Sequence, residues 1–133
     1  MIATAATALG AHNPRVLGLR RQRAAVLMAG EDFRRALPEF GALAAIYSRT
    51  AGPATLECRR HAAHCRANLG EATVALREFQ EVLEAVSDTA GDASETALDL
   101  RRSIGVLLFS EGRRTEAEGV LDALHEDMCV LLG

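Results

Sequence analysis

Three octapeptides decide the fold of this chain: LGLRRQRA (residues 17–24), LECRRHAA (residues 56–63) and LDLRRSIG (residues 98–105). Shifts of 39 and 42 residues superpose them, with a Leu at the first position, an Arg pair at the fourth and fifth, and a small residue at the last. Segments that return at intervals of about 40 residues indicate an array in which one supersecondary unit is repeated and stacked.

The same two shifts align the residues that follow each octapeptide. An Ala recurs twelve positions after the small residue, a bulky residue follows four positions later, and an aliphatic residue follows three after that. The three aligned sets are Ala36, Ala75 and Ala117; Phe40, Phe79 and Leu121; and Leu43, Val82 and Leu124. Because the apolar spacings are three and four residues, the pattern indicates helices and not strands.

Each repeat is predicted to be a hairpin of two helices. Asn13 followed by Pro14 is typical of a helix start, and Gly30, Gly70 and Gly112 are expected to end the first helix of each hairpin. Gly30 lies one position out of register with the other two, which predicts a small length change in the first turn. The six expected helices cover residues 14–29, 32–48, 54–69, 72–87, 92–110 and 113–132.

A hairpin of this size cannot bury its apolar stripe alone, so hairpins must stack. Small residues in both helices permit their close approach, and the Phe or Leu that follows fills the space between neighbouring hairpins. We therefore expect an all-α fold, a right-handed α-solenoid of three hairpins (six helices) with an extended concave surface. A length of 133 residues fits a single domain, 1–133, with repeats at about 14–50, 53–89 and 94–133.

These residues resemble the tetratricopeptide repeat (TPR) family through the small residue, the Ala twelve positions on, and the Phe or Leu four positions later. The resemblance covers about residues 9–133. The unit is longer than the standard repeat of about 34 residues. Its linker LGAHNP (residues 9–14) is similar to the linker of the longer, kinesin-light-chain type of repeat.

Some segments resemble a narrower group, the TPR segments of actinobacterial serine/threonine kinases and related signalling proteins. The similar segments are LRRQRA (residues 19–24), RALPEF (35–40) and LECRR (56–60). Two features depart from the repeat pattern: Arg66 stands where the sister repeats have Leu27 and Leu108, and the second linker is about three residues short. We expect the second hairpin to pack less closely for these reasons.

The composition excludes several classes of protein. The chain has 15 Arg and no Lys, a formal net charge of -3, only 4% aromatic residues and no Trp, which argues against a nucleic-acid surface. No apolar run approaches the roughly 20 residues that span a bilayer, and the N-terminus lacks the basic region of a secretory signal. Three Cys cannot all pair. We expect a cytoplasmic protein with no nucleic-acid or membrane partner and no cofactor.

The recurring Arg pair supplies the main candidate for a binding site. The residue two positions before the second Arg of each pair is taken as buried: Leu19, Cys58 or Leu100. A residue two positions further along a helix is rotated by about 200°. Arg21, Arg60 and Arg102 should therefore point away from the core and form a row.

In the TPR family the first helices line the concave groove, so the resemblance implies that this row faces a ligand. Neighbours expected on the same face are His61, His64, Asn68, Met28 and Phe109. Forked guanidiniums with imidazoles and an amide suit an acidic peptide or a free carboxylate. The alternative is that the arginines only pair with acidic neighbours such as Glu57 and Asp99.

A second candidate site is a metal centre formed by Cys58, His61 and Cys65, which spacings of three and seven place on one helical face. The repeat alignment argues against it, because both Cys stand where the sister repeats carry Leu or Val and free Cys behaves there as a small apolar residue. No nucleophile elbow, phosphate loop or metalloprotease motif is present in the sequence. His125 and Cys129 are four residues apart, a contact common on any helix.

The sequence therefore predicts a non-catalytic protein- or peptide-binding scaffold, placed in bacterial signalling or as an accessory to a larger enzyme. The partner is expected to be an acidic protein or peptide. Two alternatives stay open. One is a self-association (homodimer) module, since the last hairpin is expected to leave an apolar end exposed. The other is a small metal-binding protein that uses Cys58, His61 and Cys65.

Overall fold

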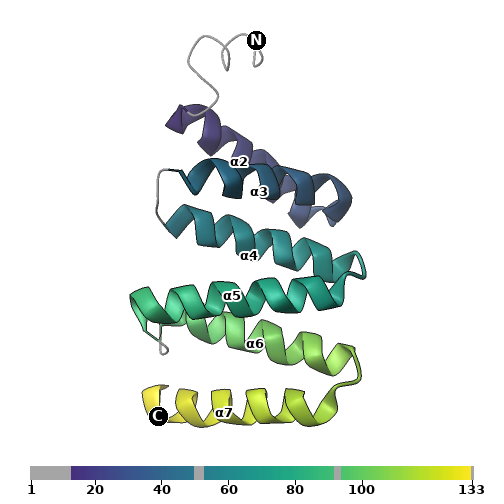
Figure 1. The fold of residues 1–133 in the computed structure, drawn as a ribbon, viewed down its shortest axis with the longest axis vertical. Helices are drawn as coiled ribbons and strands as arrows, with labels where there is room; N and C mark the ends of the chain where they lie inside the picture. Colours follow the sequence, from purple (N-terminus) through teal and green to yellow (C-terminus); the bar gives the residue numbers. More distant parts are fainter. Residues whose placement is uncertain (1–12, 50–52, 92–93, 133) are drawn as a thin grey trace. The chain divides into compact units, whose positions relative to one another are not determined.

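The computed structural model describes residues 13–49, 53–91 and 94–132, and these residues are helical with short turns and no strand. Figure 1 shows these helices following one another along the chain. The helix ends lie within three residues of the predicted ends, so the expected all-α fold of six helices is confirmed. The helices are α2 (Pro14–Ala29), α3 (Phe33–Tyr47), α4 (Pro53–Asn68), α5 (Ala72–Ala90), α6 (Glu95–Ser110) and α7 (Arg114–Leu132).

The helices form two compact units, Met1–Cys65 and Arg66–Gly133, and the boundary between them falls inside α4. In the first unit, α2 packs against α3, and α4 contributes two thiols and an alanine to the same core. Ala24 and Ala36 are completely buried, as expected for the small residues that let α2 and α3 approach closely. The core consists of Leu17, Ala24, Ala36, Phe40, Leu43, Cys58, Ala62 and Cys65.

In the second unit, α6 packs against both α5 and α7. Gly105 on α6 takes the register of Ala24, and it allows a close approach of Leu121 on α7. A Cβ atom built on Gly105 would lie 2.5 Å from Cδ2 of Leu121 on α7. Leu121 therefore occupies the volume that the methyl group of an alanine would fill.

The first turn of each hairpin contains a residue with positive φ at the same register. Gly70 (φ 88) and Gly112 (φ 78) are matched by Glu31 (φ 62), and not by Gly30. In all three turns the amide N–H that follows this residue donates to a carbonyl five residues earlier, as Asp32 does to Leu27 at 2.8 Å. The expected length change in the first turn is thus wrong. Only the residue type differs, and Glu31 carries a strain that glycine avoids.

Side chains cap the start of three of the described helices, and for α3 the Asp32 carboxylate accepts from the Arg35 N–H at 3.4 Å. The Asn13 side chain accepts a hydrogen bond from the Arg15 N–H at 2.9 Å, with Pro14 at the first helical position, as predicted. The hydroxyl of Ser94 accepts from the Ala97 N–H and begins α6 at Glu95. Each cap satisfies an amide that has no partner inside its helix.

Two positions of α2 that the repeat pattern places in the core are exposed. Leu19 is 53% and Val26 71% exposed. Their equivalents on α4 and α6 are Cys58, Cys65, Leu100 and Leu107, all of them buried. On α6 this face is covered because α5 packs beside it, and no described helix takes that place beside α2. The expectation that Leu19 is buried is therefore wrong.

We predict that Glu31→Gly stabilises the protein. A left-handed residue other than glycine costs about 1–2 kcal/mol, and glycine loses about 0.5–1 kcal/mol through the entropy of the unfolded chain. The free energy of unfolding should rise by about 1 kcal/mol, measured by chemical denaturation. Gly70→Ala is the matched reverse change, since Gly70 has the same sign of φ and no atom within 4 Å of a built Cβ, and it should destabilise. A lower stability of Glu31→Gly would contradict the turn geometry.

We predict that Gly105→Ala destabilises the second unit. Alanine improves helix propensity by about 1 kcal/mol, but overpacking against Leu121 costs about 1–3 kcal/mol. In a Leu121→Ala background the clash is gone, so the same change should stabilise by about 1 kcal/mol. A double-mutant cycle of thermal or chemical unfolding measures this reversal of sign. Equal effects of Gly105→Ala in both backgrounds would show that the two residues are not in contact.

Candidate functional site

The second Arg of the first octapeptide lines a hollow in the first unit. The hollow has a volume of about 360 Å³ and lies along the first helices α2 and α4, with Phe40 of α3 among its walls. Small residues on α2 leave the space open. The lining residues are Gly18, Arg21, Gln22, Ala25, Phe40, Glu57 and His61. Of the predicted site residues, Arg21 and His61 are thus brought together.

Arg21 is held by an acidic and an aromatic neighbour. Its Nη2 donates to Oε2 of Glu57 at 2.8 Å, and its guanidinium carbon lies 5.6 Å from the ring centre of Tyr47. Burial alone would lower the pKa of Arg21, but the Glu57 carboxylate and the Tyr47 hydroxyl outweigh it and raise the pKa. The guanidinium is therefore permanently charged, and its stacking on Tyr47 fixes its direction.

His61 lies one turn beyond Glu57 and stacks on the core. Its ring centre is 5.0 Å from that of Phe40, and Nε2 is 3.9 Å from Oε1 of Glu57. Burial, followed by the nearby charge of Arg60, lowers the pKa of His61 in spite of Glu57. At neutral pH the imidazole is uncharged, so it offers the hollow one donor and one acceptor.

The other predicted site residues of α2 and α4 do not line this hollow. Arg60 is half-buried, and its Nε has no hydrogen-bond partner among the described residues. The ring of His64 lies edge-on to Phe33 at 5.8 Å, and Asn68 is exposed near the end of α4. Met28 packs against the core of the first unit, which gives it a structural contact.

In the second unit, Arg102 and Phe109 are both exposed on α6. The guanidinium carbon of Arg114 lies 5.8 Å from the ring centre of Phe109, so the exposed ring has a cationic neighbour. Neither Arg102 nor Phe109 lines the hollow that is described next. The grouping of these two residues with Arg21 as one binding row stays a prediction.

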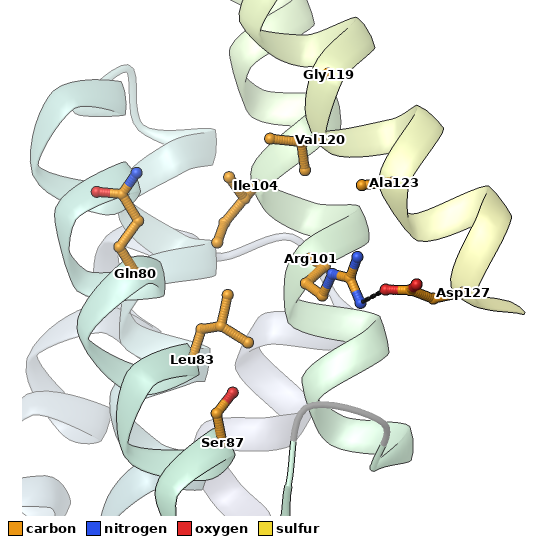
Figure 2. Close-up of a pocket in the computed structure, with 9 residues that line it drawn as sticks. All are labelled: Gln80, Leu83, Ser87, Arg101, Ile104, Gly119, Val120, Ala123 and Asp127. Atoms are coloured by element: carbon orange, nitrogen blue, oxygen red, sulfur yellow. Dashed lines mark ion pairs between the residues drawn. The ribbon is translucent and has the colours of Figure 1, made fainter.

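A larger hollow of about 570 Å³, which the repeat pattern does not predict, lies among α5, α6 and α7. Figure 2 shows Arg101 of α6 at its edge, paired with Asp127 of α7 at 2.8 Å. The walls are Gln80, Leu83, Ser87, Arg101, Ile104, Gly119, Val120, Ala123 and Asp127. The stem of Arg101 is largely buried, and the carboxylate of Asp127 is more than half exposed.

A comparison of registers explains the apolar part of this hollow's wall. In the first hairpin, Glu39 accepts hydrogen bonds from Arg20 at 3.0 Å and Arg23 at 3.1 Å. In the third hairpin, Val120 stands in place of Glu39 and Ile104 in place of Arg23. The ionic contact between the two helices is thereby replaced by an apolar one. Arg101, which stands in place of Arg20, pairs instead with Asp127, two turns beyond Val120 on α7.

The irregular residue of the second repeat also finds ionic partners. Arg66, which replaces a leucine of the sister repeats, has its Nε 2.9 Å from Oε1 of Glu78 and an Nη 3.7 Å from Glu71. Both carboxylates belong to the second unit, as Arg66 does. At the position where the sister repeats have a leucine, the second repeat therefore forms ion pairs.

The expected alternative of a metal centre is not supported by the geometry. Cys58 and Cys65 are buried in the core, and burial raises the pKa of both thiols, which keeps them protonated. Within residues 13–49, 53–91 and 94–132, no group of three or more His, Cys, Asp or Glu could hold a metal ion. Cys129 lies 3.8 Å from Nε2 of His125 on the exposed side of α7. No described helix is long and apolar enough to cross a membrane.

No protein-family model matches the sequence, and no curated protein matches it. Solved structures do match. A protein from Podosopora anserina, described as a kinesin light chain with nearly identical TPR-like repeats, superposes with a TM-score of 0.83 at 19% identity, over 98% of this chain and 63% of that one. BtubC (BKLC) from P. vanneervenii superposes with a TM-score of 0.72 at 19% identity, over 99% of this chain and 57% of that one.

These matches show the fold class: stacked helical hairpins of the TPR-like type, as the repeat pattern predicts. They also agree with the resemblance to the kinesin-light-chain type of repeat. The chain spans less than two thirds of each matched chain. The resemblance to actinobacterial kinase segments stays a prediction, as does the division into three repeats of one domain.

The two units differ in charge, a feature that the repeat pattern does not predict. Residues 1–65 contain nine Arg and four acidic residues, whereas residues 66–133 contain six Arg and fourteen acidic residues. The first unit thus carries a formal charge of +5 and the second −8, within a total of -3. The signal was present in the sequence, but the net charge of the whole chain conceals it.

We predict that the stability of the protein falls as the pH is lowered through the range in which His61 titrates. The unfolded chain takes up a proton at His61 near its ordinary pKa of about 6.5, whereas the folded chain resists it. The unfolded state then binds more protons, so the free energy of unfolding decreases as the pH drops.

The measurement compares denaturation midpoints at about pH 7.5 and about pH 5.5. His61→Gln should show a smaller loss than the parent protein. His125→Gln removes an exposed histidine of α7 and serves as the control for the loss of an imidazole elsewhere in the chain. A loss that is the same in His61→Gln and the parent would contradict the assignment to His61.

Proposed function

We propose that the protein is a non-catalytic scaffold that binds a protein or peptide partner, and that the hollow between α2 and α4 accepts an acidic side chain or a free carboxylate of that partner. The observation that supports this most directly is the meeting of Arg21 and His61 in one hollow. Helical-repeat proteins characteristically bind along the surface formed by equivalent helices of successive repeats.

The chemistry of Arg21 suits a carboxylate ligand. A guanidinium has five N–H donors in a planar fork, more than the contacts to Glu57 and Tyr47 use. A carboxylate that enters the hollow can bind the Arg21 guanidinium together with Glu57, or it can displace Glu57. Because both partners are charged, such a hydrogen bond is about twice as strong as one between neutral groups.

Glu57 sets the selectivity of this site. It neutralises Arg21 in the empty site, so a weak or monodentate anion gains little by binding there. An incoming carboxylate must reproduce the short contact of 2.8 Å that Glu57 makes. His61 can donate to the incoming carboxylate as well, since its Nε2 already lies 3.9 Å from Oε1 of Glu57.

The equivalent arginines extend the proposal to the other hairpins. Arg60 and Arg102 occupy the register of Arg21, and neither forms an ion pair with a described residue. Each would supply the carboxylate contact of its own hairpin. Exposed groups near them on the same helices would add polar and apolar contacts: His64, Asn68 and Phe109. Met28 would contribute least, because it packs on the core.

The state of the three thiols favours binding over catalysis. Two thiols are buried, and burial raises the pKa of both, whereas the third, Cys129, is exposed on α7 and has His125 beside it, a contact that their spacing of four residues produces on any helix. A cytoplasmic role in bacterial signalling, or as an accessory to a larger enzyme, is consistent with such a scaffold and rests on the narrower sequence resemblance.

A random-peptide phage library, selected on the immobilised protein, tests the binding proposal. Enriched peptides should be rich in Asp and Glu or depend on a free C-terminal carboxylate. Arg21→Gln should weaken the best of these peptides about tenfold, the loss expected when a charged, bidentate contact of about 1.4 kcal/mol is removed. Fluorescence anisotropy of the labelled synthetic peptide measures the affinity.

Arg35→Gln is the matched control, because Arg35 is an exposed arginine of α3 that pairs with Asp32 at 3.4 Å and lies outside the hollow. This variant should bind the peptide as the parent does. Enrichment of peptides without acidic character, or equal affinity of Arg21→Gln and the parent protein, would refute the proposal.

A further inference from the structure

An apolar face of α2 with basic borders is exposed in the first unit. A hollow of about 320 Å³ lies on it, lined by Val16, Leu19, Arg20, Gln22, Arg23 and Val26. Two guanidiniums, those of Arg20 and Arg23, share the single carboxylate of Glu39. The face therefore keeps a net positive charge beside its exposed aliphatic side chains.

The repeat register shows what kind of element covers such a face. Shifted by 81 residues, the lining residues of α2 fall on Ala97, Leu100, Arg101, Ser103, Ile104 and Leu107 of α6. The four apolar residues of this set are buried, and α6 packs against α5. A face of this pattern is thus covered by the second helix of a preceding hairpin.

The repeat pattern aligns α7 with α5, because each is the second helix of its hairpin. Shifted by 42 residues, the buried Val86 of α5 falls on Met128 of α7, which is 37% exposed, and Ala90 falls on Leu132, which is 76% exposed. Only Ala117 and Leu124 of α7 are fully buried. The side of α7 that would cover a following hairpin has no described partner.

The two unpartnered faces have opposite charge. Glu118, Asp122 and Glu126 recur every four residues along α7, so they form one exposed acidic stripe on that helix. The second unit carries a formal charge of −8 and the first +5. A surface with apolar residues and acidic borders on α7 therefore complements the apolar and basic face of α2.

We propose that α7 of one chain docks on the exposed face of α2 of a second copy, in the manner in which α5 packs on α6. Because α5 ends at Ala90 and α6 begins at Glu95, these two helices run antiparallel, with the last turn of one beside the first turn of the other. The same arrangement places Met128 and Leu132 beside Val16 and Leu19. The α2 face shares Gln22 with the lining of the carboxylate hollow, but the assembly does not depend on a ligand in that hollow.

The contact is head-to-tail, since it joins two different faces. A head-to-tail pair keeps one free α2 face and one free α7 face, so it adds further chains, as an open array or a closed ring, instead of stopping at a dimer. The charged borders make it sensitive to salt, because exposed charges are screened over about 10 Å at 0.1 M ionic strength and over shorter distances at higher salt.

Sedimentation velocity of the full chain tests the proposal. Between about 10 µM and about 1 mM protein at about 50 mM salt, the average mass should rise from the 14.2 kDa of one chain to more than twice that value. At about 500 mM salt it should fall by at least half. A mass of one chain at every concentration would refute the proposal.

Two variants separate the faces. Leu19→Glu places a negative charge on the α2 face at an exposed position, and Asp122→Arg reverses a charge of the α7 stripe, so each alone should remain monomeric. Mixed in equal amounts, they should form a heterodimer and nothing larger, because the intact α7 face of one meets the intact α2 face of the other. Heterodimers that fail to form, or symmetric dimers of either variant, would overturn the head-to-tail contact.

Val106→Glu is the matched control for Leu19→Glu. Val106 is 57% exposed on α6, against 53% for Leu19, and the change in charge is the same. This variant should assemble like the parent. Helical circular dichroism and the melting temperature of each variant show whether it is folded. Assembly lost equally in Val106→Glu would show that the loss comes from added charge and not from the α2 face.

Discussion

The close approach of the two helices within a hairpin is the constraint on which the rest of the structure depends. Ala24 and Ala36 are completely buried in the first unit, and Gly105 leaves the space that Leu121 occupies in the second. Larger residues would push the helices apart, because their separation is set by the side chains at the contact. With the separation fixed, each helix keeps one face for its hairpin partner and a second for the neighbouring hairpin.

Much of the fold was predictable because small and bulky residues recur at fixed spacing. The Ala and Phe positions of the repeat define which face is buried, and a Gly or Pro near each end defines where a helix begins or stops. The meeting of Arg21 and His61 followed from the same register. Two residues on equivalent faces of successive first helices, α2 and α4, line the same side of the structure.

The sequence pattern was insufficient where a property depends on neighbours that the repeat does not contain. Leu19 has the same register as Leu100, but its burial depends on a preceding helix. Glu31 adopts the conformation of its glycine counterparts because the turn imposes it, although its side chain disfavours it. Periodicity predicts what a residue would do beside equivalent neighbours, and these positions lack them.

The uneven charge of the chain changes what a charged molecule in solution encounters. At physiological ionic strength a charge is screened over about 8 Å, whereas a helix of 16 residues such as α2 is about 24 Å long. An approaching ligand therefore responds to the unit nearest to it. The isoelectric point of about 5.8 averages a strongly basic unit and a strongly acidic one, and it describes the surroundings of neither.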